Sequence, residues 1–511
     1  MKIIKKLLKS KALYIGSALI IQLLILVLLM SYFSTQFLPI YYTMLVLSVL
    51  VSILVMNRES DSSSKMLWVF TIMALPFFGG LMYLLFGGRK IPKALMIQDR
   101  QAYADYAAYA EQNLKTLKNS GISDPTLSRM THMAWNNGYF PVYANTGLRY
   151  YPTGEAQFEA LMDAVKKAKD YIFIETYIID EGSVLSELLE VLEAKAAEGV
   201  DVRLMYDDFG CILNLPEDFD EQLRAKGIQV HRFNPIHPQL AIQMNNRDHR
   251  KTIIVDGKTA FTGGSNLADE YVNRIERFGY WKDMGVQVDG AAVEPFVIAF
   301  LQIWNYSSEI STPYEQFVLD HSKTESQPDM GYVLPFFDSP TDDKNVGRKF
   351  HQNMIQLANE SVWITTPYLI LDEEMISGLE LAVQNGVDVR IVVPAIPDKK
   401  IVYEVTKANS EILTRKGIKV YEYTPGFIHG KVTLVDKKHA VCGTVNMDFR
   451  SYYANYECGM WMYDTPVIPQ IEQDFESIFA KSRLMTRADE KNTNWLLRQY
   501  RLILKIFSPL L

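Results

Sequence analysis

The stretch His249-Arg-Lys-Thr-Ile-Ile-Val-Asp256 occurs a second time in the chain, as His429-Gly-Lys-Val-Thr-Leu-Val-Asp436. Each copy is followed by a glycine-containing segment and an asparagine, Asn266 or Asn446. Corresponding His, Lys, Asp and Asn residues are all 180 positions apart. The apolar, partly β-branched run inside each copy is typical of a buried strand. This spacing predicts two similar halves that carry the same set of polar side chains.

The duplication extends beyond these motifs. Two further pairs of segments match, and each half also has a short β-like run: Glu198–Met205 with Asn385–Val392, Arg224–Val230 with Arg415–Val420, and Tyr171–Ile174 with Val362–Ile364. Strands that alternate with helical segments predict a mixed α/β fold with a largely parallel sheet. We therefore expect two tandem α-β-α halves forming a pseudo-dimer, at 130–310 and 325–511, joined by a linker at about 310–345.

The repeated residues are suited to chemistry on a phosphodiester. A His and a Lys two positions apart on a strand point to the same face. Lysine ammonium and asparagine amide groups donate to phosphoryl oxygens, and histidine serves as nucleophile or general acid/base. The predicted catalytic residues are His249, Lys251, His429 and Lys431, and the predicted phosphate-binding residues are Asn266 and Asn446.

Two pairs of acids accompany these residues. Asp256 and Asp436 complete the motif and count among its catalytic candidates, but each falls at a turn after the strand. We favour a structural role for them, holding the turn or pairing with a lysine. Asp283 and Glu457 follow further downstream. An acid bonded to the far nitrogen of a catalytic histidine fixes its tautomer, and we predict this orienting role for both.

No metal or cofactor is expected. His231, His237 and His249 have no partner cysteine or acid at zinc-like spacing. The three cysteines, Cys211, Cys442 and Cys458, indicate neither a disulfide framework nor a metal site, which fits a reducing compartment.

The N-terminal region predicts contact with a membrane. Three uncharged apolar runs, Leu13–Phe33, Phe37–Met56 and Met66–Phe86, each approach the ~20 residues of a membrane-spanning helix. We predict a membrane region at 1–95 with two or three transmembrane helices. Five lysines before the first run favour a cytoplasmic N-terminus. The third run contains Pro76 and two glycines, so it is the candidate for a re-entrant or interfacial segment.

Charge divides the chain in the same way. Residues 1–100 contain 11 Lys or Arg and 3 acids, whereas the remainder contains 41 basic and 56 acidic residues. The basic N-terminal region suits an anionic lipid surface, and the acidic remainder argues against a nucleic-acid channel.

Near the C-terminus, Trp495–Phe507 combines apolar residues with basic residues at spacings of three and four. This pattern is equally typical of an amphipathic helix at a membrane interface and of a terminal helix packed against the protein.

The paired motifs resemble the phospholipase D superfamily, whose signature is His-x-Lys-x-x-x-x-Asp with a downstream Gly and Asn. Within it, the chain from about residue 40 is similar to bacterial cardiolipin synthases. The segments that carry this likeness are Ala74–Gly79, Tyr83–Gly87, Phe173–Ile178, Arg247–Lys251, Thr262–Gly264, Thr365–Tyr368, Ile428–Lys431 and Asn446–Ser451. The run Leu13–Phe33 is an addition to the two membrane runs of better-known members.

The resemblance implies a metal-independent transfer in two steps, in which two phosphatidylglycerol molecules give cardiolipin and glycerol. It favours His249 as the nucleophile and His429 as the acid/base. It also implies a multi-pass protein of the cell membrane, with its catalytic part on the cytoplasmic face and no nucleic-acid partner. The nearest alternative is a membrane-bound phospholipase D that hydrolyses or exchanges head groups. A superfamily nuclease and a non-catalytic scaffold fit less well, and the oligomeric state stays open.

Overall fold

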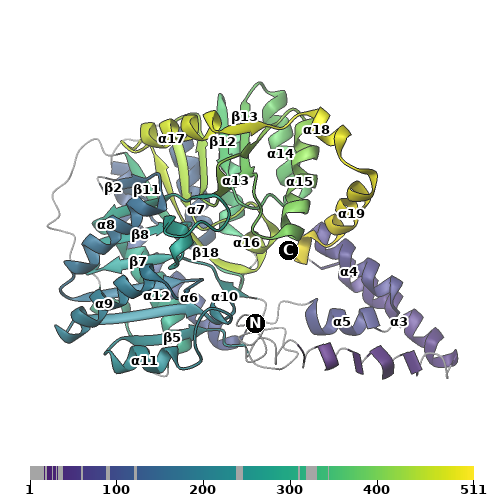
Figure 1. The fold of residues 1–511 in the computed structure, drawn as a ribbon, viewed down its shortest axis with the longest axis horizontal. Helices are drawn as coiled ribbons and strands as arrows, with labels where there is room; N and C mark the ends of the chain where they lie inside the picture. Colours follow the sequence, from purple (N-terminus) through teal and green to yellow (C-terminus); the bar gives the residue numbers. More distant parts are fainter. Residues whose placement is uncertain are drawn as a thin grey trace.

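The computed structural model describes residues 38–58, 61–76, 78–87, 92–119, 124–144, 146–236, 246–308, 311–317, 331–342 and 344–510, with scattered positions between 17 and 32. Two sheets with covering helices form the body of the molecule, and the N-terminal helices α3–α5 extend from one end of it (Figure 1).

The first sheet has the spatial order β2 (Gly147–Tyr151), β10 (Gly285–Asp289), β8 (Thr259–Gly263), β7 (Thr252–Val255), β3 (Tyr171–Thr176), β4 (Asp201–Asp207) and β5 (Gln229–Phe233). The helices of this half are α8 (Gly154–Lys166), α9 (Ser183–Ala197), α10 (Asp208–Cys211), α11 (Phe219–Ala225) and α12 (Glu294–Ser307), with the 3-10 turns η2 (Asp269–Val272) and η3 (Ala291–Val293).

The second sheet repeats this order and extends it. It runs β1 (Tyr143–Ala144), β11 (Tyr332–Asp338), β18 (Asn455–Tyr463), β17 (His439–Gly443), β16 (Lys431–Val435), β12 (Ser361–Thr365), β13 (Asp388–Pro394), β14 (Lys419–Tyr423) and β19 (Ser482–Leu484). The helices of this half are α13 (Val346–Leu357), α14 (Glu373–Gln384), α15 (Lys400–Arg415), α16 (Phe449–Tyr453), α17 (Ile468–Ala480), α18 (Arg487–Asn492) and α19 (Trp495–Ile506), followed by η6 (Ser508–Leu510). The chain thus contains two tandem halves of one α/β fold.

The prediction of a largely parallel sheet is wrong. Along these two sheet orders, the parallel pairs are β3–β4 and β4–β5 in the first sheet and β12–β13 and β13–β14 in the second. The pairs β7–β8 and β16–β17 are antiparallel hairpins. A helix joins each parallel pair, whereas the loops 256–258 and 436–438 are too short for a crossover connection. The motif therefore sits on the antiparallel part of each sheet.

The predicted linker at about 310–345 is also not simply a linker. It contains η4 (Tyr314–Gln316) and β11, and β11 pairs along its whole length with β18 of the second sheet. The side chains of β11 are almost all buried, which a connecting loop would not require.

The N-terminal part joins the body through two helices, α6 (Lys93–Asn119) and α7 (Pro125–Gly138), and α6 packs against α12. The predicted run Phe37–Met56 corresponds to α3 (Leu38–Met56). The run Met66–Phe86 is divided into α4 (Ser62–Ala74) and α5 (Phe78–Phe86), with Pro76 in the break. The run Leu13–Phe33 lies partly outside the described residues. Within the described residues of the whole chain, none of the helices is both long enough and apolar enough to cross a bilayer.

Candidate active site

Short strands that cross between the halves bring the two histidines to one place. β6 (Arg247–Asp248) runs beside β18 of the second half, and β15 (Gly426–Ile428) runs beside β9 (Tyr280–Lys282) of the first. The main-chain N–H of His249 donates to the carbonyl of Tyr456 at 2.9 Å, and that of His429 donates to the carbonyl of Lys282 at 2.8 Å. Each histidine is therefore fixed by the residue that precedes the acid of the other half.

The acid side chains complete this crossing. Nδ1 of His249 lies 2.9 Å from Oε2 of Glu457, and Nδ1 of His429 lies 2.7 Å from Oδ2 of Asp283. Both carboxylates are fully buried. The structure thus places both predicted orienting acids against a histidine, each in the opposite half. Because each histidine uses Nδ1 for its acid, Nε2 is the ring nitrogen that remains for chemistry, and at His429 it lies beside the ammonium of Lys431.

Both motif lysines lie against their own histidines. Nζ of Lys251 donates to the carbonyl of His249 at 2.6 Å, and Nζ of Lys431 donates to the carbonyl of His429 at the same distance. The ammonium of Lys431 is also 2.9 Å from Nε2 of His429. Burial lowers the pKa of Lys251 to about 8 and that of Lys431 to about 7. A phosphodiester bound between the two would stabilise their charged forms.

Burial and neighbouring cations also act on the histidines. The pKa of His249 is held well below its usual range by burial and then by Lys251. Burial and Lys431 lower the pKa of His429 to about 4, although Asp283 opposes them. An anionic diester beside the lysines would offset their field and raise both pKa values towards the range in which a general acid works.

The two orienting acids have different protonation behaviour. Burial raises the pKa of Glu457 to about 7, and Lys251 and the hydroxyl of Thr444 only partly oppose this. Burial would likewise raise the pKa of Asp283, but the interactions with His429, Lys431 and the main-chain N–H of Met284 together outweigh burial, and the net pKa is lowered. Asp283 is therefore ionised near neutral pH, whereas Glu457 is close to its midpoint.

The motif aspartates hold the opposite end of each strand. Asp256 accepts main-chain hydrogen bonds from Lys169, Asp170 and Tyr171 at 2.8–3.1 Å. Asp436 accepts the equivalent bonds from residues 359–361. Both aspartates have positive φ, 52° and 50°, in the turn that follows β7 or β16. Seven residues of extended chain separate each from its histidine, roughly 20 Å, so this geometry favours a structural role over a catalytic one.

The two asparagines differ. Oδ1 of Asn266 accepts from the main chain of Ile178 at 2.9 Å, and its Nδ2 donates to the hydroxyl of Tyr271 at 2.8 Å. One of the two N–H groups of its amide is thus already used. Asn446 is equally buried, and within the described part of the chain its Oδ1 has no hydrogen-bond partner.

Sequence reasoning missed the aromatic wall beside His429. Tyr271, Trp281 and Phe427 lie with ring centroids 5.5, 5.2 and 5.8 Å from its imidazole. They come from η2, β9 and β15, so no single stretch of sequence indicates that they lie together. His249 has Tyr177 as its aromatic neighbour, at 5.1 Å. These aromatic rings exclude water from the side of the imidazole that they cover.

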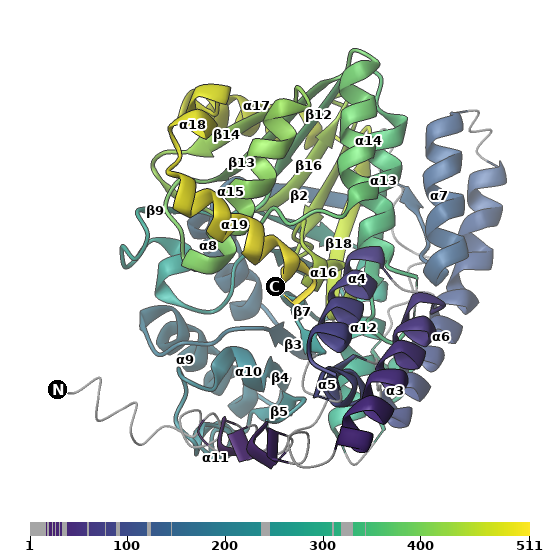
Figure 2. The same cartoon turned by 90° about the vertical axis from the view of Figure 1, so that its right-hand side faces the viewer.

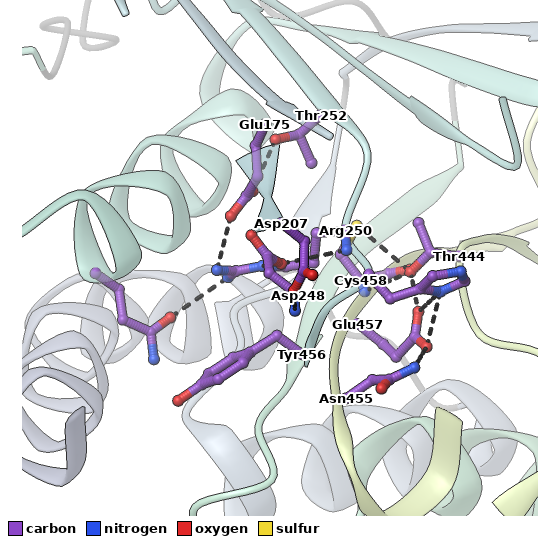
Figure 3. Close-up of polar contacts among 12 residues, drawn as sticks. Glu175, Asp207, Asp248, Arg250, Thr252, Thr444, Asn455, Tyr456, Glu457 and Cys458 are labelled. Carbon is purple, nitrogen blue, oxygen red and sulfur yellow. Dashed lines mark hydrogen bonds and ion pairs between the residues drawn. The ribbon is translucent and has the colours of Figure 1, made fainter. Parts of the chain in front are cut away.

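A buried charged network behind His249 was also missed. Arg250 is fully buried, with one guanidinium nitrogen 2.8 Å from Glu175 and Nε 3.2 Å from Asp248. Its guanidinium also lies 5.3 Å from the ring centroid of Tyr456. Figure 3 shows this network beside Glu457, which accepts hydrogen bonds from Thr444 and Asn455.

The network continues to α6, the helix that follows the N-terminal apolar region. Arg250 donates to Gln302 of α12 at 3.4 Å, and Gln302 donates in turn to the buried Asp99 of α6. Asp99 also accepts from the hydroxyl of Tyr456 at 3.3 Å. The helix α6 is thus hydrogen-bonded to the residue that precedes Glu457.

Two tandem halves that share one site, with a His, a Lys and a crossed acid from each, define a phosphodiester-transfer enzyme of the phospholipase D class. A family model described as "Cardiolipin synthase, PLD-like domain" matches twice, over residues 161–279 and 352–479. A second model, "Phospholipase_D-nuclease N-terminal", matches residues 45–88.

Whole-chain comparisons agree. A cardiolipin synthase of Alkalihalophilus pseudofirmus is 32% identical over 91% of this chain and 92% of its own. An uncharacterized protein of Streptococcus mutans is 38% identical over 89% of this chain and 98% of its own. A crystal structure of phosphatidylserine synthase from Haemophilus influenzae covers 75% of this chain and all of its own with a TM-score of 0.60, and at 14% identity it shows the shared fold alone. The chain belongs to the cardiolipin synthase family of phospholipase D-like proteins, and it is a phosphatidyltransferase.

Proposed function

We propose that this enzyme transfers a phosphatidyl group from one phosphatidylglycerol to another, giving cardiolipin and glycerol. The observation that carries the proposal is the pair of crossed histidine–acid contacts, His249 with Glu457 and His429 with Asp283. Two histidines with separately fixed tautomers suit a reaction that needs both a nucleophile and an acid/base. The family relatives named cardiolipin synthase support the choice of substrate.

In the proposed mechanism, Nε2 of His249 attacks the phosphorus of the first phosphatidylglycerol. The bond to the glycerol oxygen breaks, and His429 gives that oxygen a proton, leaving a phosphatidyl-histidine. His429 then takes the proton of a terminal hydroxyl on the second phosphatidylglycerol. The freed oxygen attacks phosphorus and releases His249, so the proton balance is restored. The ionised Asp283 beside His429 suits the acid/base role, because it stabilises the imidazolium.

Lys251, Lys431 and Asn446 would hold the phosphoryl oxygens during both steps. Asn266 would act through Tyr271 and the loop at Ile178. We further propose that the apolar runs before residue 95 anchor the protein in the cell membrane with the catalytic halves on the cytoplasmic face. Both reactants reside there, and water must be excluded at the second step because it would give phosphatidic acid.

The test follows labelled phosphatidylglycerol with the purified full-length protein in detergent, with a chelator present. Cardiolipin and glycerol are the expected products. Both are lost in His249→Ala and His429→Ala and retained in the exposed-site control His132→Ala. Phosphatidic acid as the main product would instead identify a phospholipase D. Activity that disappears with the chelator and returns with a divalent metal would contradict the metal-free mechanism.

A further inference from the structure

The C-terminal helix α19 is fixed to the body along one face. Arg501 is buried, and its Nε donates to Glu404 of α15 at 2.8 Å while a second nitrogen pairs with Glu411. One turn later, Leu504 packs into a cluster with Val405 of α15 and Phe449 of α16. A buried arginine with two acidic partners costs free energy to separate, so this face holds the orientation of the helix.

The opposite face of α19 is apolar and exposed. Side chains 41–67% exposed form it, continuing into η6: Trp495, Leu496, Leu502, Ile503, Ile506, Phe507 and Leu510. At about 100° per residue these positions share one broad arc of the helix, opposite Arg501 and Leu504. A contiguous exposed apolar surface of this kind marks a binding surface.

The charges of the helix indicate which partner covers this face. Residues 495–511 contain three basic residues and no acid. Arg501 pairs with two acids of α15, and Arg498 and Lys505 lie seven positions apart on the same edge of the apolar arc. Long basic side chains at such an edge reach lipid phosphates while their stems lie along the apolar surface. This charge pattern complements an anionic leaflet.

Through η6, the C-terminal helix adjoins the N-terminal apolar region and the helix that follows Asn446. η6 contacts both α4 and α16, and α16 begins three residues after Asn446. α4 exposes Met66 and Phe70. Figures 1 and 2 both show α19 at the end of the molecule from which α3 and α4 extend.

We propose that α19 lies in the headgroup region of an anionic bilayer, with its apolar face among the acyl chains, and sets the height of the active site above the lipid surface. The inference rests on the proposed function, because it assumes lipid substrates delivered from a bilayer. The ion pairs of Arg501 transmit that position to α15, and Leu504 transmits it to α16 and the loop that carries Asn446.

The binding test places an environment-sensitive fluorophore on Leu502→Cys of the full-length protein, since the three native cysteines are buried. The matched control is Leu381→Cys on α14, which is 56% exposed. In phosphatidylglycerol vesicles the label at 502 is expected to shift to shorter wavelength and to be quenched by brominated acyl chains, while the label at 381 is unaffected. An unshifted label at 502 overturns the proposal. A shift that depends on protein concentration, with no quenching by lipid, also overturns it in favour of a second copy of the chain.

The activity test compares Leu502→Glu/Ile503→Glu with Leu381→Glu. The double variant is expected to lose about tenfold in rate on phosphatidylglycerol vesicles, which corresponds to weakened burial of two aliphatic side chains. In detergent-mixed micelles, where substrate reaches a detached site, its rate is expected to match the wild type. Equal losses in vesicles and micelles would contradict the membrane role of α19. A wild-type enzyme inactive in both would contradict the proposed function instead.

Discussion

Charged residues surround the histidine of the first half, whereas aromatic and apolar residues surround the histidine of the second half. Arg247, Asp248 and Arg250 flank His249, whereas the residues 180 positions later are Phe427, Ile428 and Gly430. The main chain nevertheless delivers both histidines in the same way, through a short crossing strand and one hydrogen bond to the other half. The two halves thus share the main-chain arrangement that positions the histidine, but they differ in the residues that surround it.

Local packing explains part of this divergence. A Cβ at Gly430 would lie 2.4 Å from Sδ of Met284, so no side chain like that of Arg250 fits there without movement of Met284. A Cβ at Gly264 would lie 1.9 Å from Oδ1 of Asp283, whereas the corresponding residue of the second half, Thr444, donates to Glu457. The aspartate, Asp283, therefore lies against a glycine, whereas the longer glutamate, Glu457, accepts a hydrogen bond from a hydroxyl group.

The largest expected effect is a loss of activity when the acid beside His429 is changed. Asp283→Asn removes the charge that holds the tautomer of His429 and stabilises its imidazolium, so we expect the rate of cardiolipin formation to fall about 10³–10⁴-fold. Initial rates with labelled phosphatidylglycerol measure this. The exposed carboxylate control Asp218→Asn should retain wild-type activity. A fall of less than about tenfold would show that Asp283 does not support proton transfer.

The next effect concerns the charged network of the first half. Arg250→Met leaves Glu175 and Asp248 buried beside each other without their cation, and we expect a loss of about 3–5 kcal/mol in the free energy of unfolding. A lower thermal midpoint in detergent is the readout. The exposed pair of Lys226 and Glu193 provides the control, because Lys226→Met should cost under about 1 kcal/mol. Equal midpoints for the two variants would refute a structural role for the network.

A smaller effect separates the two acids. Glu457→Gln removes a hydrogen-bond partner that is only partly ionised, and we expect a loss of about 10–100-fold in kcat/KM. Glu457 has a pKa raised to about 7, so it is neutral below that pH and ionised above it. Lys431, with a pKa lowered to about 7, loses its proton over the same range, so the kcat/KM of the wild type should pass through a narrow maximum near pH 7, and the acid limb of that maximum should vanish in Glu457→Gln. The basic limb, where Lys431 and Lys251 lose protons, should remain in both. An unchanged acid limb would assign it to another group.

The smallest effect refines the same comparison. Thr444→Val removes the hydroxyl that lowers the pKa of Glu457. One hydrogen bond to a carboxylate corresponds to about one pKa unit, so the acid limb should move to higher pH by about that amount. Because Lys431 and Lys251 lose protons over the same range, the maximum of kcat/KM in the variant should lie at higher pH and be lower than that of the wild type. A limb that stays in place while the rate falls at every pH would indicate a packing defect instead.

Sequence analysis anticipated the duplicated halves and the residues that meet at the site, because both follow from repeated local patterns. It did not anticipate the mixed sheet, because apolar strand runs look alike whether they pair parallel or antiparallel. β11 was misread as part of a linker, because Ser, Thr, Pro, Gly and Asp are frequent around it. The aromatic wall at His429 was missed because Tyr271, Trp281 and Phe427 come from three separate segments.

The sequence by itself determined which residue types are present twice and at what spacing, since His, Lys, Asp and Asn repeat at 180 positions. The prediction that His and Lys share one strand face is not what the structure has, because both histidines lie outside the strands, between β6 and β7 and between β15 and β16. Only the tertiary structure decided that each histidine meets the acid of the other half, across 208 and 146 residues of chain. That pairing depends on the exchange of β6 and β15 between the halves, and the free energy of such long-range contacts is realised only once both halves are folded.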